Sequence, residues 1–398
     1  MRDLLASSTH LAGIDSSKAI GPVGRPNGRE STVLVVGGAG YVGSILVAQL
    51  LDSGYDVLVL DPLLYSGDSL APVLGRPGFE LHVGDSRDEA TVRSLLSRVG
   101  SVVHLGEIVG DPACELDPTV TVSVNYSATI RLAELAQLAG VERFIYPSSC
   151  SVYGATDVIV DESGTHNPVS LYGRVKSASE EHILDLRTDT FHPTVFRLAT
   201  VYGLSPRPRF DLVVNVLAGR AAADRSIVVQ GGGQWRPFVH VADAATVLAT
   251  TLTMPLEKVS GQIFNLGSNL QNHTIAGVAE IVREHVPDVA VEVTESVDPR
   301  NYRVDFDKLA EVFGFRPSRT VSDGIAEIVR AVDNRHVVDI RDAYHSNVRA
   351  LVETDARHRL WRADLAGRPA DAFRPRDVEV IQRVMPTRRL ALLEDAVS

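Results

Sequence analysis

The sequence is poor in cysteine, in long apolar runs and in positive charge. Its 398 residues include two cysteines, Cys114 and Cys150, too few for a disulfide framework and without metal-binding spacing. No apolar stretch reaches about 18 residues, the length that a membrane-spanning helix needs. The formal net charge of −11 argues against binding to nucleic acid or to an anionic membrane. These absences favour a cytoplasmic protein with reduced thiols and no bound metal.

The two ends of the chain differ in composition from its middle. Residues 1–31 lack a sustained apolar core, so they do not resemble a secretory signal, and their Gly, Ser and Pro content predicts a mobile N-terminal tail. Residues 333–398 are polar and rich in arginine. An oligomer contact and a lid over the substrate are both compatible with this C-terminal extension.

Between the ends, short apolar segments alternate with segments of helical spacing. Strands are predicted at 32–38, 56–61, 79–85, 101–106, 143–149 and 193–200, and helices at 41–54, 88–100, 125–140 and 170–186. Strands that are apolar throughout and separated by helices predict an α/β fold, with a doubly wound parallel sheet covered on both faces. From about residue 201 the pattern loosens and Pro and Arg increase, which predicts a second, smaller region.

A glycine pattern stands between the first strand and the first helix. "GGAGYVG" supplies Gly37, Gly40 and Gly43, with Tyr41 and Val42 between the last two. Glycines allow a tight turn and a close approach of a pyrophosphate to the backbone, and the helix N-terminus offers free N–H groups. The pattern also occurs in turns that only need glycine, but the strand before it and the helix after it favour a dinucleotide site.

Carboxylates follow the next two strands. Asp61 ends the second strand, 18 residues after Gly43, where it can accept both ribose hydroxyls of an adenosine. It would repel a 2′-phosphate, so NAD is favoured over NADP. Asp85, after the third strand, is compatible with a contact to adenine or with a helix N-cap, a role for which Ser86 competes.

Tyr172 and Lys176 lie four residues apart in "YGRVK", hence on one face of the predicted helix. A free tyrosine has a pKa near 10, and a neighbouring ammonium together with the positive nicotinamide ring of NAD favours the phenolate. Tyr172 is therefore a candidate acid/base for interconverting a hydroxyl and a ketone.

The ordered motifs together resemble a known family. "GGAGYVG", Asp61, "HLG", Asn125, "SSCSVYG", "YGRVK" and "RPFVHVAD" are similar to the extended short-chain dehydrogenase/reductases, and specifically to their NAD-dependent nucleotide-sugar epimerase/dehydratase branch, over residues 32–332. The resemblance implies a Rossmann-type NAD-binding domain over 32–200, with a return of 238–255, and a nucleotide-sugar-binding region over 201–332. It also implies a homodimer.

The resemblance assigns roles around the reacting centre. Ser149 would hydrogen-bond the reacting sugar oxygen, Tyr172 would be the base, and Lys176 would hold the ribose and tune Tyr172. Asn125 and Leu105, the latter in "HLG", would lie near the cofactor.

Two positions bear on the choice of reaction. Family dehydratases carry an Asp-Glu pair after the residue equivalent to Ser149, whereas this chain has Cys150 and Ser151. Cys150 could act as an acid, although a small buried residue beside the pocket is the commoner role. Glu107 stands near the expected nicotinamide end, where it could contact a substrate hydroxyl, supply a missing carboxylate or cap the following segment.

Four further residues would face the substrate. The resemblance places Arg236 and Arg300 at the nucleotide diphosphate, Asn215 on the helix that faces the nucleotide, and Thr200 where an asparagine is usual. Arg207 and Arg209 are weaker candidates, for which solvation in a loop is the favoured interpretation.

The favoured function is NAD-dependent epimerisation of a nucleotide-diphosphate sugar at C4, through a transient keto-sugar. The alternatives are a dehydratase that uses Cys150 or Glu107, a keto-sugar reductase and, last, a non-catalytic NAD-binding scaffold.

Overall fold

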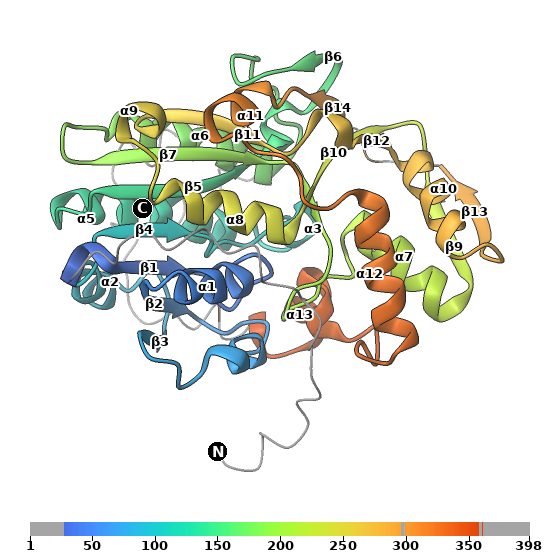
Figure 1. Cartoon of the computed structure of the whole chain (residues 1–398), viewed down its shortest axis with the longest axis horizontal. Helices are drawn as coiled ribbons and strands as arrows, with labels where there is room; N and C mark the ends of the chain where they lie inside the picture. The colour runs from blue at the N-terminus through green and yellow to red at the C-terminus, as the bar shows by residue number, and fades with distance from the viewer. Residues whose placement is uncertain (1–27, 296–297, 299, 358–359, 361–398) are drawn as a thin grey trace, which may run out of the picture.

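The structure, a computed structural model, describes residues 28–295, 298, 300–357 and 360. Its centre is a sheet of seven parallel strands in the order β11-β7-β5-β4-β1-β2-β3 (Figure 1). These are β1 Thr32–Val36, β2 Asp56–Asp61, β3 Phe79–Val83, β4 Ser101–His104, β5 Arg143–Ser149, β7 His192–Leu198 and β11 Gln262–Leu266. The predicted fold class, a Rossmann-type doubly wound α/β sheet, is confirmed.

Helices cover both faces of this sheet (Figure 1). One layer contains α1 Gly43–Asp52 and α8 Val241–Thr251, and the other contains α2 Glu89–Leu96, α5 Thr129–Leu138 and α6 Leu171–Asp185. Successive residues of a strand point to opposite faces. In β1, Val33 and Val35 therefore pack in the core with α1 and α8, whereas Leu34 and Val36 pack in the core with α2, α5 and α6.

The strand β11 lies outside the range expected to return to the sheet. It pairs in parallel with β7, from Gln262 opposite Thr194 to Leu266 opposite Leu198. The expected return, 238–255, contains α8 but not this strand. Gln262 and Asn265 interrupt the apolar run of β11, which explains why hydrophobic pattern alone did not indicate a buried strand.

The smaller region lies beside the carboxyl ends of the central strands (Figure 1). Its core packs α7 Val213–Asp224, α10 Ile275–His285 and α12 Val321–Asp333 against β9 Ser226–Gln230, which pairs with β13 Ala290–Thr294. A three-stranded sheet joins β8 Thr200–Tyr202, β10 Trp235–His240 and β12 Asn272–Thr274, and a ribbon pairs β6 Ala155–Val160 with β14 Asn301–Val304.

The remaining elements are short. They are α3 Asp111–Cys114, α4 Pro118–Val122, α9 Leu256–Val259, α11 Asp307–Phe313 and α13 Asn347–Glu353, a π-helical turn Ser123–Ala128, and 3₁₀ turns at Gly28–Ser31, Asp68–Val73, Cys150–Tyr153, Asn269–Gln271 and Ala343–His345. Most of the predicted N-terminal tail, residues 1–27, and most of the C-terminal extension, residues 361–398, lie outside the described residues.

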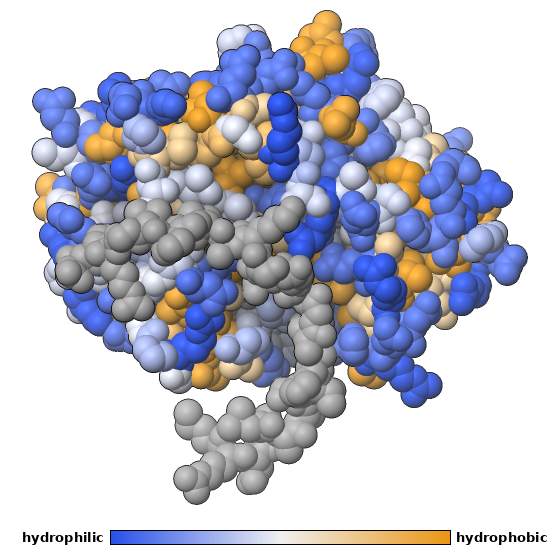
Figure 2. Space-filling model, viewed as in Figure 1, coloured by the Kyte–Doolittle hydropathy of each residue, from blue (hydrophilic) through white to orange (hydrophobic). Residues whose placement is uncertain are grey.

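The surface in this view is largely hydrophilic, and its apolar residues are scattered (Figure 2). One apolar spot lies over β6, where Val158 is 65% exposed and Ile159 is 57% exposed. In the part of the chain that the structure describes, no helix is long and apolar enough to cross a membrane.

Candidate active site

Two adjoining cavities open at the carboxyl ends of the parallel strands, where ligands of doubly wound sheets bind. The smaller has a volume of about 660 Å³ and the larger of about 1170 Å³. Residues that line both are Gly37, Gly40, Tyr65, Leu105 and Glu107. The predicted cofactor and chemical motifs thus meet at one edge of the sheet.

The glycine-rich turn has the geometry that its sequence predicts. Gly37 has φ +82°, and a Cβ there would lie 2.6 Å from the backbone nitrogen of Gly106. A Cβ on Gly43 would lie 2.2 Å from the carbonyl oxygen of Gly37. Tyr41 and Val42 line the larger cavity beside the N-terminus of α1. Only glycine allows this turn, which leaves backbone open to a bound phosphate.

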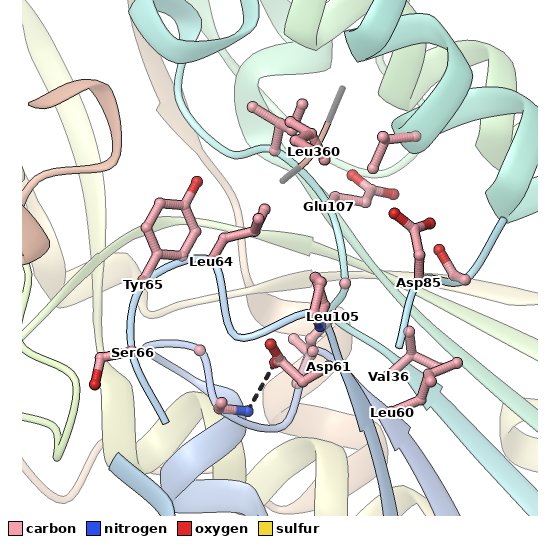
Figure 3. A pocket seen from close by; sticks show the side chains of 18 residues that line it. Val36, Leu60, Asp61, Leu64, Tyr65, Ser66, Asp85, Leu105, Glu107 and Leu360 are labelled. Atoms are coloured by element: carbon pink, nitrogen blue, oxygen red, sulfur yellow. Dashed lines mark hydrogen bonds between the residues drawn. The ribbon is translucent and has the colours of Figure 1, made fainter. Parts of the chain in front are cut away.

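Asp61 lies at the end of β2 and lines the smaller cavity (Figure 3). Its carboxylate accepts hydrogen bonds from the backbone nitrogens of Ala39, at 2.9 Å, and Leu63, at 2.8 Å. Burial raises the pKa of this carboxyl, while these bonds and the charge of Arg207 lower it. A carboxylate has about four lone-pair sites, so Asp61 can still accept bonds from two ribose hydroxyls.

Asp85 and Ser86 line the same cavity, but neither caps the following helix. The N-cap of α2 is Asp88, whose side chain accepts from the backbone of the first turn, so the capping alternative is wrong because the helix begins later than expected. Asp85 instead forms an ion pair with Arg87 at 2.7 Å. Arg87 also donates to the carbonyl oxygen of Leu360, at 2.7 Å.

Ser149, Tyr172 and Lys176 meet in the larger cavity. Ser149 ends β5, and the other two residues lie one turn apart on α6. Tyr172 hydrogen-bonds to Ser149. The Lys176 ammonium donates to the carbonyl oxygen of Pro147 at 2.6 Å and lies 5.9 Å from the ring centre of Tyr172. This arrangement can hold and move a proton on a substrate hydroxyl.

The groups of the protein alone, without a nicotinamide ring, favour the protonated phenol of Tyr172. Burial raises the pKa of Tyr172 well above 10, and the charge of Glu107 is the next largest cause; the hydrogen bond with Ser149 opposes them. Lys176 also forms an ion pair with Glu107 at 2.7 Å. Its positive charge is balanced by a carboxylate that lines the same cavity.

Three candidate residues are held away from the cavities. Cys150 is 1% exposed and its thiol donates to the carbonyl oxygen of Arg197 at 3.2 Å, because the chain turns inward after β5. Burial also raises its pKa. The side-chain amide of Asn125 accepts a hydrogen bond from the backbone nitrogen of Ile108, at 2.8 Å, and donates one to its carbonyl oxygen, at 2.7 Å. Asn215 bonds to the backbone of Gly203 and to Tyr41. None of the three candidates lines either cavity described above.

The substrate candidates divide in a similar way. Thr200 and Arg300 line the larger cavity, and Arg300 forms ion pairs of 2.6 Å with Asp111 and with Asp298. Arg236 lines neither cavity, since it is buried against Asp298 at 2.9 Å. Arg236 therefore supports the segment that carries Arg300.

Arg207 and Arg209 are buried, so the interpretation as solvated loop residues is wrong. Both line the larger cavity, and Arg209 is paired with Asp211 at 2.9 Å. Arg207 stacks 4.3 Å from the ring centre of Tyr65, and none of the described residues accepts a hydrogen bond from its buried Nε and Nη2. Burial, and then the charge of Arg209, lower the pKa of Arg207 to about 10. A buried cation in this state fits an anionic ligand.

The described start of the C-terminal extension also reaches the site, which is compatible with a lid over the substrate, one of the two roles that the sequence left open. Asn347 lines the larger cavity, and its side chain donates to the carbonyl oxygen of Val109 at 2.7 Å. Leu360 lines the smaller cavity, near Glu107 and Asp85 (Figure 3). These contacts join segments more than 200 residues apart, and no local pattern signals them.

Comparisons with known proteins agree with this arrangement. The model of the NAD dependent epimerase/dehydratase family matches residues 33–267. The UDP-glucose 4-epimerase of Mycolicibacterium smegmatis is 31% identical over 324 residues, covering 76% of this chain and 98% of that protein. UDP-glucuronic acid decarboxylase 6 of Arabidopsis thaliana is 28% identical over 310 residues, covering 74% of this chain and 86% of that protein.

A solved structure is similar over the same range. It is a double mutant of the dTDP-glucose 4,6-dehydratase DesIV from Streptomyces venezuelae, with NAD and DAU bound. It shares 27% of its sequence with this chain at a TM-score of 0.69, and the match covers 76% of this chain and 98% of that chain. The glycine turn and Asp61 fit NAD, which is the cofactor of this family. The chain belongs to the NAD-dependent epimerase/dehydratase family, within the extended short-chain dehydrogenase/reductases.

Proposed function

We propose that this enzyme is a nucleotide-sugar epimerase that inverts C4 of a nucleotide-diphosphate sugar through a transient keto-sugar. The observation that carries the proposal is one cavity that holds Ser149, Tyr172 and Lys176 together with the cations Arg207 and Arg300. The cations suit a diphosphate, and the first three residues suit a hydroxyl.

Each residue has a distinct task in this proposal. When bound, NAD supplies the hydride acceptor and, in the return step, the hydride donor. Ser149 hydrogen-bonds the C4 oxygen, and Tyr172 takes the hydroxyl proton and later returns it. Lys176, held by Pro147, orients the ribose next to Tyr172. Arg207 and Arg300, which line the same cavity, bind phosphate oxygens of the substrate, so the sugar can rotate while its diphosphate stays bound.

The position of Cys150 supports epimerisation over dehydration. Dehydration needs a group that removes a carbon-bound proton and one that protonates the leaving hydroxyl. The Cys150 thiol bonds to a backbone carbonyl in the core, which leaves Glu107 and Asp111 as the carboxylates that line the larger cavity and could serve a dehydratase. A keto-sugar reductase would need reduced cofactor added for each turnover.

A homodimer and a cytoplasmic location belong to the same proposal. The resemblance to the family supports the first. The second is supported by the two cysteines, both buried and free, and by the acidic net charge. Within the described residues, no group of three or more His, Cys, Asp or Glu side chains is placed to hold a metal ion.

The test is to incubate the enzyme in D₂O with a panel of nucleotide-diphosphate sugars, without added reduced cofactor, and to follow the products by NMR. A C4 epimer free of deuterium supports hydride removal and return. Deuterium beside a new carbonyl, with loss of water, would mean dehydration. The Tyr172→Phe variant serves as the control, and we expect its turnover to fall by about 10²–10⁴-fold while it still binds NAD.

A further inference from the structure

Glu107 lies where the two cavities join. It follows β4 by three residues, and its side chain is 2% exposed although it lines both cavities (Figure 3). A buried carboxylate is costly unless its charge is paired and its oxygens are hydrogen-bonded. The contacts of Glu107 therefore indicate why it is tolerated there.

The Glu107 carboxylate contacts three other elements. Oε2 lies 2.7 Å from Nζ of Lys176, on α6. Oε1 accepts hydrogen bonds from the hydroxyl of Tyr146 on β5, at 2.9 Å, and from the hydroxyl of Thr129 on α5, at 3.4 Å. Nζ of Lys176 lies 4.4 Å over the ring centre of Tyr146. The carboxylate, the ammonium and the Tyr146 phenol thus form one buried network.

The other titratable groups around this network come from β4, α3 and α6. They are His104 on β4, Asp111 and Cys114 on α3, and Tyr172 on α6. Burial and then the charge of Lys176 lower the pKa of His104 to about 3, so it is neutral. Asp111 is ion-paired with Arg300. Glu107 is therefore the carboxylate that directly balances Lys176.

We propose that Glu107 is a positioning residue for catalysis, which holds the Lys176 ammonium against Pro147 and keeps the proton on Tyr172 until substrate and cofactor bind. This inference rests on the proposed role of Tyr172 as acid/base. Glu107 acts through Lys176 and Tyr172 and takes no proton from the substrate.

The expected effect follows from the charges. With Glu107 ionised, its negative charge opposes ionisation of Tyr172 and offsets the help of Lys176. In Glu107→Gln the negative charge is lost, while Lys176 keeps its positive charge. The remaining positive charge favours the phenolate, so the pKa of Tyr172 should fall by roughly 1–2 units.

The first experiment measures this without substrate. Tyrosine ionisation is followed by ultraviolet difference absorbance against pH, in the wild type and in Glu107→Gln, each compared with its Tyr172→Phe counterpart to isolate one residue. We expect Tyr172 to titrate at lower pH in Glu107→Gln. Glu115→Gln, in which an exposed carboxylate eight residues along the chain is neutralised in the same way, should leave the titration unchanged.

The second experiment measures kcat/KM against pH, once a substrate is known from the NMR panel. We expect the acidic limb of the profile to move down by roughly 1–2 pH units in Glu107→Gln, with activity retained on the alkaline side. A uniform fall at all pH values, with no shift, would mean a structural role. Complete loss of activity at every pH in a folded variant would mean direct proton transfer by Glu107. Either result overturns the proposal.

A third measurement covers the case in which Glu107→Gln folds poorly. Lys176→Met and the double variant Glu107→Gln/Lys176→Met complete a double-mutant cycle for urea unfolding. If Glu107 holds Lys176, the double variant is more stable than the sum of the single losses predicts. Additive losses would contradict the pairing. Because neither this cycle nor the tyrosine titration uses substrate, both test Glu107 even if the epimerase proposal fails.

Discussion

The walls of the larger cavity carry three buried cations, Lys176, Arg207 and Arg209. Arg209 is paired with Asp211, whereas Lys176 and Arg207 differ in what balances their charge. Lys176 on α6 is 3% exposed and is paired with Glu107 at 2.7 Å. Arg207, in the loop after β8, is 5% exposed, and no described residue accepts a hydrogen bond from its Nε and Nη2. The ammonium of Lys176 is thus paired with a carboxylate of the protein, whereas two nitrogens of Arg207 have no such partner among the described residues.

This difference separates two kinds of functional charge. A buried cation that is paired with a carboxylate is held in position before any ligand binds, but its charge is largely balanced by that carboxylate. A buried cation with no counter-charge is destabilising by itself, and an anionic ligand relieves that cost when it binds. The α6 wall is thus suited to chemistry at a fixed position, and the Arg207 wall is suited to affinity for a phosphate.

Removing the ion pair between Lys176 and Glu107 should have the largest effect on stability. Lys176→Met leaves Glu107 buried without its cation, and we expect the free energy of unfolding to fall by about 3–5 kcal/mol. Urea unfolding followed by circular dichroism measures the loss. Lys308→Met is the control, because Lys308 donates to uncharged oxygens of Gln262 and Ile263, and should cost about 1 kcal/mol. Equal losses in both variants would argue against the pair.

The corresponding substitution of Arg207 by methionine should lower ligand affinity rather than the free energy of unfolding. Arg207→Met removes an uncompensated charge and the stacking on Tyr65, so the free energy of unfolding should change by no more than about 1 kcal/mol. Affinity for a phosphate ligand should fall about 10–100-fold. Calorimetry with NAD and with UDP separately tells which diphosphate Arg207 contacts. The control is Arg220→Met, at an exposed position of α7. Unchanged affinity for both ligands would remove Arg207 from the site.

A further cation, Arg300, is intermediate, because it lines the cavity and is paired with Asp298. Burial raises the pKa of Asp298, but the bonds and charge of Arg300, with the charge of Arg236, lower it to about 2. A lowered carboxyl pKa stabilises the fold above about pH 4, and this stabilisation is lost as pH falls from about 4 towards 2. Partial exposure limits it to about 1–2 kcal/mol.

In Asp298→Asn this dependence should be absent, so its unfolding free energy should fall less than that of the wild type between pH 5 and pH 3. Urea midpoints at each pH measure the difference. Parallel curves for the two proteins would show that the ion pair contributes nothing in solution.

The smallest loss of stability is expected for a substitution of Asn347, which lines the larger cavity. Asn347 donates from its side chain to Val109 and from its backbone to Asp211, the partner of Arg209. Asn347→Ala removes the first bond and should cost about 1 kcal/mol, read as a lower thermal midpoint. Asn334→Ala, at the exposed end of α12, should change little. If the two variants lose the same stability, the hydrogen bond from Asn347 to Val109 does not contribute measurably to the free energy of unfolding.

Much of the cofactor side was predictable from the sequence, because its requirements are local. A tight turn before α1 needs glycine at Gly37 and Gly43, and the residue that ends β2 must lie at the ligand edge of a parallel sheet, which places Asp61. The four-residue spacing of Tyr172 and Lys176 sets one helix face. These residues need only their own strand, turn or helix to be in position.

Other residues could not be assigned in this way, because their roles depend on what the folded chain brings beside them. Cys150 and Ser149 are adjacent in sequence, yet one thiol enters the core and one hydroxyl lines the cavity. Arg207 has the composition of a solvated loop and is buried against Tyr65. For Glu107 the sequence left open a cap, a substrate contact and a replacement carboxylate, and its ion pair with Lys176 appears only in the folded chain.

By itself, then, the sequence determined the fold class and indicated NAD, and it predicted the residues of the NAD site and the pair proposed to move a proton, since backbone strain and helical spacing act over a few residues. The tertiary structure alone decided which charges are balanced. It brought Glu107 to Lys176 across 69 positions of the chain and left Nε and Nη2 of Arg207 without a hydrogen-bonded carboxylate among the described residues. Pairing and burial of charge depend on long-range packing, because desolvation is set by every segment that closes over the group.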